Sequence, residues 1–246
     1  MKDFISGFCY AFSGFKLINK RGIRKFILGP LVINSILFTL IIFLGFNEFK
    51  ELIDWIESQW QWLSWISWLL WPVFVIINLI VVFFCFSIIA NLIASPFNGL
   101  LSEATENHLK LEKNNQHRAE VSTKITMGLI LGAIFNEIRK LLYISCRAIP
   151  LLILFIIPVF QLAAPFIWLI FAAWIMAIEY MEYPLGNHEK EFHEVREWVK
   201  DNRNFSLGFG MGVTLFTAVP IVNFLAMPVA ITSATKIYME KAQSEI

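Results

Sequence analysis

Residues 26–47 read FILGPLVINSILFTLIIFLGFN, and this stretch decides the fold class because it contains no charged side chain. As an α-helix rising about 1.5 Å per residue it would span about 30 Å, which is the thickness of the hydrocarbon core of a bilayer. The pair Gly29-Pro30 lies near its start, where proline costs a helix little. The sequence therefore predicts a first transmembrane helix over residues 26–47.

The overall composition also indicates a membrane protein. Of 246 residues, 57% are hydrophobic and 16% are charged, whereas soluble domains average about 45–50% and about 25%. The net charge of +1 creates no general basic field, so no nucleic acid partner is expected and any anion affinity must be local. The 9 Trp and 24 Phe residues suit the aromatic belts at membrane interfaces.

A second charge-free window covers residues 58–102, and its part 68–92 is the predicted second span. The sequence Ser-Pro-Phe-Asn-Gly at 95–99 is predicted to break the helix, because proline disfavours helical geometry at the residue before it. Residues 103–147 are polar and then amphipathic, which predicts helices joined by a loop at 113–118.

Residues 1–25 form an amphipathic N-terminal segment, with small and polar residues on one helical face and phenylalanines on the other. Cations follow where a signal peptide would have its cleavage site. We expect a helix that lies in the membrane interface or packs on other helices through its small residues.

In each of two further charge-free windows, 148–178 and 204–235, a pair of prolines flanks an amide residue, namely Pro158 and Pro165 around Gln161, and Pro220 and Pro228 around Asn223. Each window is either one tilted span or a hairpin of two half-length helices, and such halves reach only about 20 Å. The paired prolines favour hairpins. The predicted fold is one all-α integral membrane domain over 1–246, with two long transmembrane helices, two partly penetrating hairpins and an N-terminal amphipathic helix.

The distribution of Lys and Arg predicts the orientation. If both later windows are hairpins, 19 of the 20 basic residues lie on one side of the membrane, and the loop after the first span holds the remaining one. The positive-inside rule makes the basic face cytoplasmic. With four full spans, the loop at 179–203 would instead lie outside.

The best candidate for anion binding is Gly22, Ile23, Arg24 and Lys25. Glycine permits close backbone approach, a helix start offers unpaired N–H groups, and two adjacent cations add charge-assisted bonds. The alternative is a positive-inside anchor beside lipid headgroups. Polar residues in or beside the apolar windows are candidates for a translocation path or for interhelical hydrogen bonds: Asn34, Ser87, Asn91, Asn98, Glu103 and Asn223.

No sequence feature predicts enzyme chemistry. There is no phosphate-binding glycine loop, nucleophile elbow or dinucleotide fingerprint, and His188 and His193 do not have the spacing of a helical zinc pair. We expect no enzyme activity, no metal and no cofactor.

Four segments together resemble the CysZ sulfate permease family, in order and in spacing, over nearly the whole chain. They are the Arg-Gly-Ile-Arg-Lys-Phe opening at 21–26 with Pro-Leu-Val-Ile-Asn at 30–34, the run NLIASPFNGLLSE at 91–103, YMEYPLGNH at 180–188, and PIVNFLAMPVA at 220–230. The opening departs from the family pattern at Ile23, where the family has Leu, and at Lys25, where it has Arg. Lysine lacks the bidentate fork of arginine.

The resemblance implies a multi-pass protein of the bacterial inner membrane that brings in sulfate for assimilation to cysteine. It also implies two long helices, two partly penetrating hairpins and a homo-oligomer. The expected partners are thus sulfate, membrane lipid and further copies of the chain. A non-transporting membrane scaffold that organises a partner or lipid is the alternative, because basic residues and interfacial helices would serve that role too.

Overall fold

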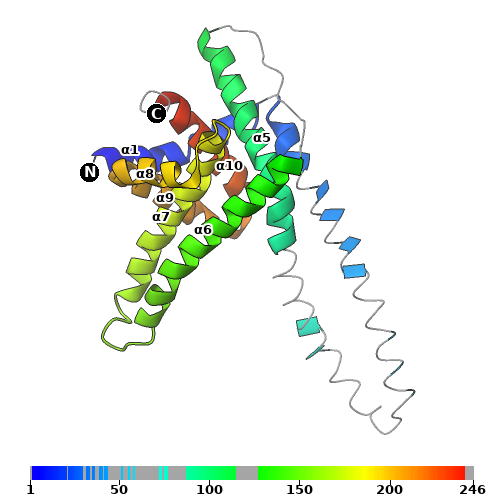
Figure 1. Cartoon of the computed structure of the whole chain (residues 1–246), viewed down its shortest axis with the longest axis vertical. Helices are drawn as coiled ribbons and strands as arrows, with labels where there is room; N and C mark the ends of the chain where they lie inside the picture. The colour runs from blue at the N-terminus through cyan, green and yellow to red at the C-terminus, as the bar shows by residue number, and fades with distance from the viewer. Residues whose placement is uncertain are drawn as a thin grey trace. The chain divides into compact units, whose positions relative to one another are not determined.

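The computed structural model describes residues 2–20, 22–29, 87–114 and 127–241, with scattered positions between 32 and 76. Every regular element in these parts of the chain is helical, as expected (Figure 1). The elements are α1 (Lys2–Ala11), α2 (Gly14–Leu17), α5 (Ser87–Asn114), α6 (Met127–Leu154), α7 (Ala164–Gly186), α8 (Phe192–Asp201), α9 (Arg203–Thr217) and α10 (Pro220–Glu240). A further helical stretch covers 24–29.

The chain divides into two compact units, residues 1–27 with 96–246, and residues 28–95. Much of the predicted span at 26–47 and most of that at 68–92 lie outside the described residues. The scattered positions that are described between 32 and 76 are helical, and their side chains, including Ile36 and Phe43, are largely exposed and apolar. Among the described residues, α7 is the one helix long and apolar enough to cross a membrane.

Glycines on α9 let three helices approach closely at the centre of the larger unit. A side chain at Gly208 would overlap the backbone of Phe4 on α1, and one at Gly212 would overlap Ala11. On the opposite face of α9, a side chain at Gly210 would overlap the carbonyl of Ala173 on α7. Small residues at this spacing are the usual means of close helix packing in membrane proteins. They place α9 between α1 and α7.

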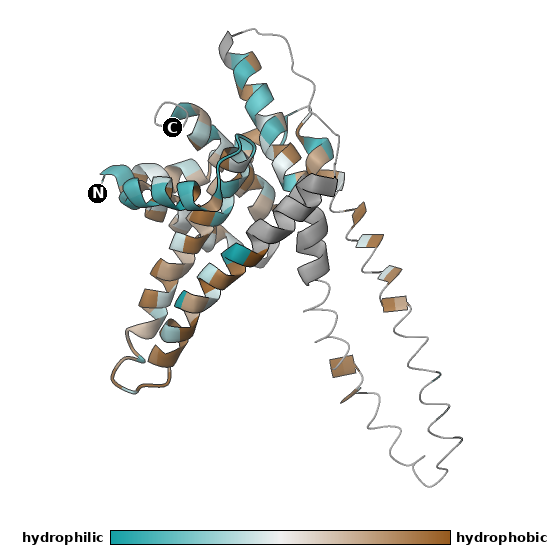
Figure 2. Cartoon of the chain, viewed as in Figure 1, coloured by the Kyte–Doolittle hydropathy of each residue, from teal (hydrophilic) through white to brown (hydrophobic). Residues whose placement is uncertain are grey.

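The N-terminal helix packs through its small residues, which was one of the two expectations for it. Gly7 and Ala11 of α1 are buried, while Phe4 and Phe12 stay partly exposed. In Figure 2 the described part of this helix carries teal residues, whereas brown concentrates at the tip of the α6–α7 hairpin.

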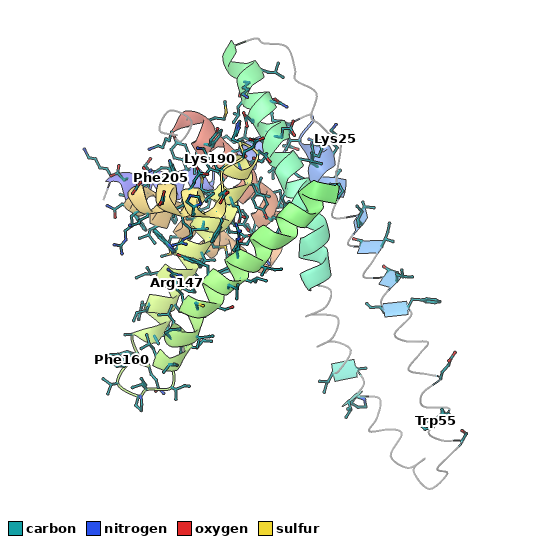
Figure 3. All side chains as sticks on the ribbon, in the orientation of Figure 1. Lys25, Trp55, Arg147, Phe160, Lys190 and Phe205 are labelled. Carbon is teal, nitrogen blue, oxygen red and sulfur yellow. The ribbon has the colours of Figure 1, made fainter. Side chains whose placement is uncertain are left out.

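The α6–α7 hairpin reverses over residues 155–163, which include Pro158 and Gln161. Figure 3 labels Phe160 at this tip. Pro165 stands in the first turn of α7, where its missing N–H would have had no helical partner. The tip is strongly apolar and exposed, with Val159 at 84% and Leu162 at 86% exposure.

One expected helix break is wrong, and the second hairpin reverses slightly earlier in the chain than its two prolines suggested. The helix α5 runs without interruption from Ser87 to Asn114, through the sequence at 95–99. In the second hairpin the chain reverses at 218–219, before Pro220, and Pro228 lies inside α10, so Asn223 is helical. An interior proline removes a single backbone hydrogen bond, and at both sites burial of the following residues offsets that loss, since Leu101 and Val229 are almost fully buried.

The short helix α8 covers α7 and α9 with an amphipathic face, because Phe192, Val195, Trp198 and Val199 are buried. Its start is a capping box between Glu191 and Glu194. The Glu194 carboxylate accepts hydrogen bonds from the Glu191 N–H and from Lys190, which lowers the pKa of Glu194.

Candidate functional site

The segment before the predicted anion motif is fixed by a serine of α10. Ser233 Oγ accepts a hydrogen bond from the Gly14 N–H at 2.8 Å and donates one to the Ala11 carbonyl at 2.9 Å. The kink between α1 and α2 is thereby held from both sides. A side chain at Gly14 would overlap the carbonyl of Val229. This clamp fixes the segment that precedes the predicted anion motif.

Gly22 makes the turn that the motif requires. Its φ of 97° lies in the left-handed region that glycine adopts without strain. The next residue, Ile23, is fully buried in the hydrophobic core, and its N–H donates to the Lys20 carbonyl at 3.2 Å. The helical stretch 24–29 begins directly after it. Ile23 therefore anchors the turn.

The two cations of the motif are exposed and have different surroundings. The Arg24 guanidinium donates to the Asn19 carbonyl at 3.0 Å and to the Asn19 side-chain oxygen. The Lys25 ammonium lies 4.8 Å from the centre of the Phe26 ring, and Figure 3 labels Lys25 on this stretch. Arg21 lies outside the described residues.

Asn98 forms a second cluster, which joins α5 to α7 and α10. This side chain is buried, and its amide donates to the Tyr183 hydroxyl at 3.1 Å and to the Met227 sulfur at 3.4 Å. One turn further along α5, Ser102 Oγ lies 2.9 Å from Thr235 Oγ1, in a fully buried pair. The Asn187 amide donates to the Gly99 carbonyl at 2.9 Å.

A carboxylate continues this cluster at its polar end. Glu106 is buried and pairs at 2.5 Å with Lys110, four residues further along α5. Its other oxygen lies 2.9 Å from His188 Nε2, and the His188 ring stacks on Tyr238 at 4.7 Å. The sequence could not predict this contact, because Glu106 and His188 are 82 residues apart in the chain.

A buried ion pair lies between the arms of the first hairpin. Lys140 of α6 is buried and contacts Glu179 at 2.8 Å and Glu182 at 3.3 Å, both on α7. The opposite charges offset the cost of removing them from water. This contact fixes the register of α6 against α7.

The other predicted path residues are only partly described. Asn34 lies outside the described residues, and Ser87 and Asn91 belong to α5 although their side chains lie outside the description. Glu103 is half-buried on α5, and Asn223 is exposed in the first turns of α10. Within the described part of the chain, no group of three or more His, Cys, Asp or Glu could hold a metal ion.

Comparison with known proteins gives the same family as the motifs. The family model described as Sulfate transporter CysZ/Etoposide-induced protein 2.4 matches residues 10–228. The sulfate transporter CysZ of Pseudomonas fluorescens is 38% identical over 242 residues, which is 98% of this chain and 96% of that protein. The chain belongs to the CysZ family. The same-named protein of Vibrio cholerae is 39% identical over 236 residues, covering 95% of this chain and 93% of that protein.

Membership of the CysZ family confirms the resemblance drawn from the four segments. Three of them meet in the structure, since Asn98 of the segment 91–103 contacts Tyr183 of 180–188 and Met227 of 220–230. The fourth contains the Gly22 turn. The four segments that identify the family thus contain the Gly22 turn and all three residues of the Asn98 contacts.

Proposed function

We propose that this protein carries sulfate into a bacterial cell across the inner membrane, for assimilation into cysteine, as a channel-like or facilitative permease and not as an enzyme. The observation that carries the proposal is the similarity to proteins named as sulfate transporters over 98% of the chain. The apolar composition and the exposed apolar hairpin tip support a place in the membrane.

Sulfate binds, in this proposal, at the turn formed by Gly22, Ile23, Arg24 and Lys25. The left-handed Gly22 lets the backbone approach the anion, and the buried Ile23 holds the turn in place. The first N–H groups of the following helix and the Arg24 fork supply hydrogen bonds. Lys25 contributes charge without a fixed fork. Asn19 orients the Arg24 guanidinium before sulfate arrives.

The path across the membrane runs along the polar residues of the apolar windows, which are Asn34, Ser87, Asn91, Asn98, Glu103 and Asn223. Amide and hydroxyl groups replace part of the hydration shell of the anion along this line. The support is their position in or beside windows that lack charged side chains. The hydrogen bond from Asn98 to Tyr183 keeps one of these amides at a fixed place between three helices.

The first hairpin enters the membrane without crossing it. Arg147 is exposed on α6, with its guanidinium 3.7 Å from the centre of the Tyr143 ring. Beyond it α6 has only seven residues, 148–154, before the tip, and these extend about 10 Å along the helix. A full crossing needs about 30 Å. The charged groups of the hairpin therefore stay near one interface while the tip is buried in lipid.

The protein works as an oligomer in the inner membrane with its N-terminus in the cytoplasm. Partly penetrating hairpins cannot form a continuous path from one side of the membrane to the other without help from the long helices or from a second copy. The exposed apolar side chains between 32 and 43 provide a surface for lipid or for that copy. The skewed distribution of Lys and Arg supports the orientation.

Radiolabelled sulfate flux into liposomes that contain only this protein tests the proposal. We expect uptake down a sulfate gradient that exceeds the leak of protein-free liposomes. The Arg24→Ala variant, reconstituted in equal amount, should give reduced uptake at low sulfate. Correctly assembled protein that gives no flux at any gradient would contradict transport by this chain and would favour the scaffold role.

A further inference from the structure

A cavity of about 600 Å³ lies between the N-terminal helices, the end of α5 and the last turns of α10. It is separate from the turn at Gly22–Lys25, none of whose residues lines it. Ligand sites commonly have volumes of this size. The cavity is lined by Cys9, Phe12, Ser13, Lys16, Leu17, Lys20, Leu109, Glu112, Lys236 and Glu240.

The walls of this cavity are held by contacts on both sides. The Ser233 clamp fixes the kink on which Ser13 stands. The Tyr10 hydroxyl donates to Glu240 of α10 at 2.7 Å, and Lys236 lies 3.9 Å from the same carboxylate. Glu240 is thus already bonded to two neighbours, and the shape of the cavity is set without a ligand.

Three polar groups that line the cavity have no partner among the described residues. Ser13 Oγ is buried from solvent and forms no hydrogen bond. A buried hydroxyl without a partner is costly and rare in native proteins. Lys16 and Lys20 are exposed beside it, and neither ammonium is within ion-pair distance of a carboxylate among the described residues. One hydroxyl donor and two cations therefore line the same wall.

The charge and the surroundings of the cavity indicate which class of ligand it would suit. Three lysines and two glutamates give it a formal charge of +1, which complements a phosphodiester with one negative charge better than a sulfate dianion. Phe12, in its wall, is 41% exposed and packs edge-on against Phe216, as the partly exposed Phe15 does. The polar wall thus adjoins an aromatic surface suited to acyl chains.

We propose that this cavity binds the headgroup of an anionic phospholipid, with Lys16, Lys20 and Ser13 donating to its phosphodiester. Phe12 and Phe15 contact the start of its acyl chains. Bound there, the lipid joins α1 and α2 to the end of α5 and to α10. It ties the N-terminal helices to the membrane surface, which is a role independent of sulfate transport.

Delipidated protein in detergent, titrated with phosphatidylglycerol and followed by native mass spectrometry, tests this proposal. The variant Lys16→Gln/Lys20→Gln should bind phosphatidylglycerol about tenfold more weakly than the wild type, because charge-assisted hydrogen bonds are lost. The control Lys200→Gln removes an exposed lysine of α8 outside the cavity and should leave binding unchanged. Diacylglycerol lacks the phosphate, so its binding should be the same for the wild type and for both variants.

Equal phosphatidylglycerol binding by the wild type and the double variant, with unchanged thermal melting of both lipid-free proteins, would overturn the proposal. A large excess of sodium sulfate provides the second test. If sulfate displaces phosphatidylglycerol from the wild type and binds the double variant more weakly, the cavity is a site for free oxyanions and the lipid assignment is wrong. Displacement by neither sulfate nor inorganic phosphate is the expected result.

Discussion

At the scale of single residues, Arg24 and Lys25 are neighbours with unequal roles in the proposed sulfate site. The Arg24 guanidinium is held by Asn19 through two hydrogen bonds, so its planar fork has a set direction. The Lys25 ammonium is a point charge that lies over the Phe26 ring. An anion that approaches the Gly22 turn therefore finds one oriented donor and one adaptable charge.

We expect Arg24→Ala to weaken sulfate binding at least about tenfold, since hydrogen bonds to charged groups are worth roughly 1.5–3 kcal/mol each. Lys25→Ala should weaken it less, and raised ionic strength should weaken it in both the wild type and the Lys25→Ala variant. Calorimetric titration of the purified proteins with sulfate measures these effects. Unchanged affinity in a correctly assembled Arg24→Ala variant would reduce the motif to a topology anchor.

Tyr10 provides a pH-dependent contribution to stability. Its hydroxyl donates to Glu240, and this hydrogen bond, followed by burial, raises the pKa of Tyr10 to about 12. Because the folded state favours the protonated phenol, the stabilisation is complete below the ordinary pKa of 10.0. It is lost as the pH rises through about 12. Compared with Tyr10→Phe, the wild type should lose thermal stability between pH 10 and 12 in detergent.

The Tyr10→Phe variant serves as the reference because lysines titrate over the same pH range in both proteins. Identical pH dependence of the two melting curves would mean that Tyr10 and Glu240 do not interact in the folded protein. Ultraviolet difference absorbance at high pH gives an independent reading, since the wild type should contain one more late-ionising tyrosine than the variant.

At the scale of helices, glycines explain how α9 packs closely against both α1 and α7. Their effect is steric, because the backbone of one helix occupies the place where a side chain of the other would stand. Gly210 faces the Ala173 carbonyl, which belongs to the middle of α7 and cannot move without shifting the whole helix. Gly186, at the end of α7, has open space around it.

Gly210→Ala should therefore destabilise the protein by about 2–3 kcal/mol, as overpacking of a rigid core does. The melting temperature should fall by roughly 5–10 °C. The matched control Gly186→Ala should leave it unchanged or slightly higher, because alanine restricts the unfolded chain more than glycine does. Thermal melting in detergent measures both. A Gly210→Ala protein as stable as the control would show that α7 and α9 are not packed this closely.

At the scale of the whole molecule, the sequence was sufficient for the helical class and for the family. Each charge-free window and each family segment is a continuous stretch of sequence, so it can be recognised without knowledge of the tertiary structure. The window 204–235 does reverse near its middle, at 218–219. The expected break at 95–99 failed because it rested on the local preference of proline, and Pro228 is likewise accommodated inside α10. Tertiary burial of Leu101 and Val229 outweighs that preference.

The candidate sites also differ in whether the sequence alone could predict them. The Gly22 turn was predictable because its residues are adjacent in the sequence. The contacts of Asn98 with Tyr183 and of Glu106 with His188 join residues more than 80 positions apart, and no periodicity relates them. The lipid cavity combines Lys16, Lys20 and Lys236 in one site, so it could be identified only when the first and last helices were placed side by side.

The last prediction concerns how the chain is oriented in the membrane. If both later windows are hairpins, the N-terminus, residues 103–147 and residues 179–203 all lie in the cytoplasm. His193 is a suitable reporter, since its side chain is 62% exposed at the start of α8. In a background without Cys9, Cys85 and Cys146, His193→Cys should resist a membrane-impermeant maleimide in intact cells and react after the membrane is opened. Glu51→Cys, in the loop after the first predicted span, should react in intact cells. If His193→Cys also reacts there, the window 148–178 crosses the membrane completely and the four-span arrangement is correct.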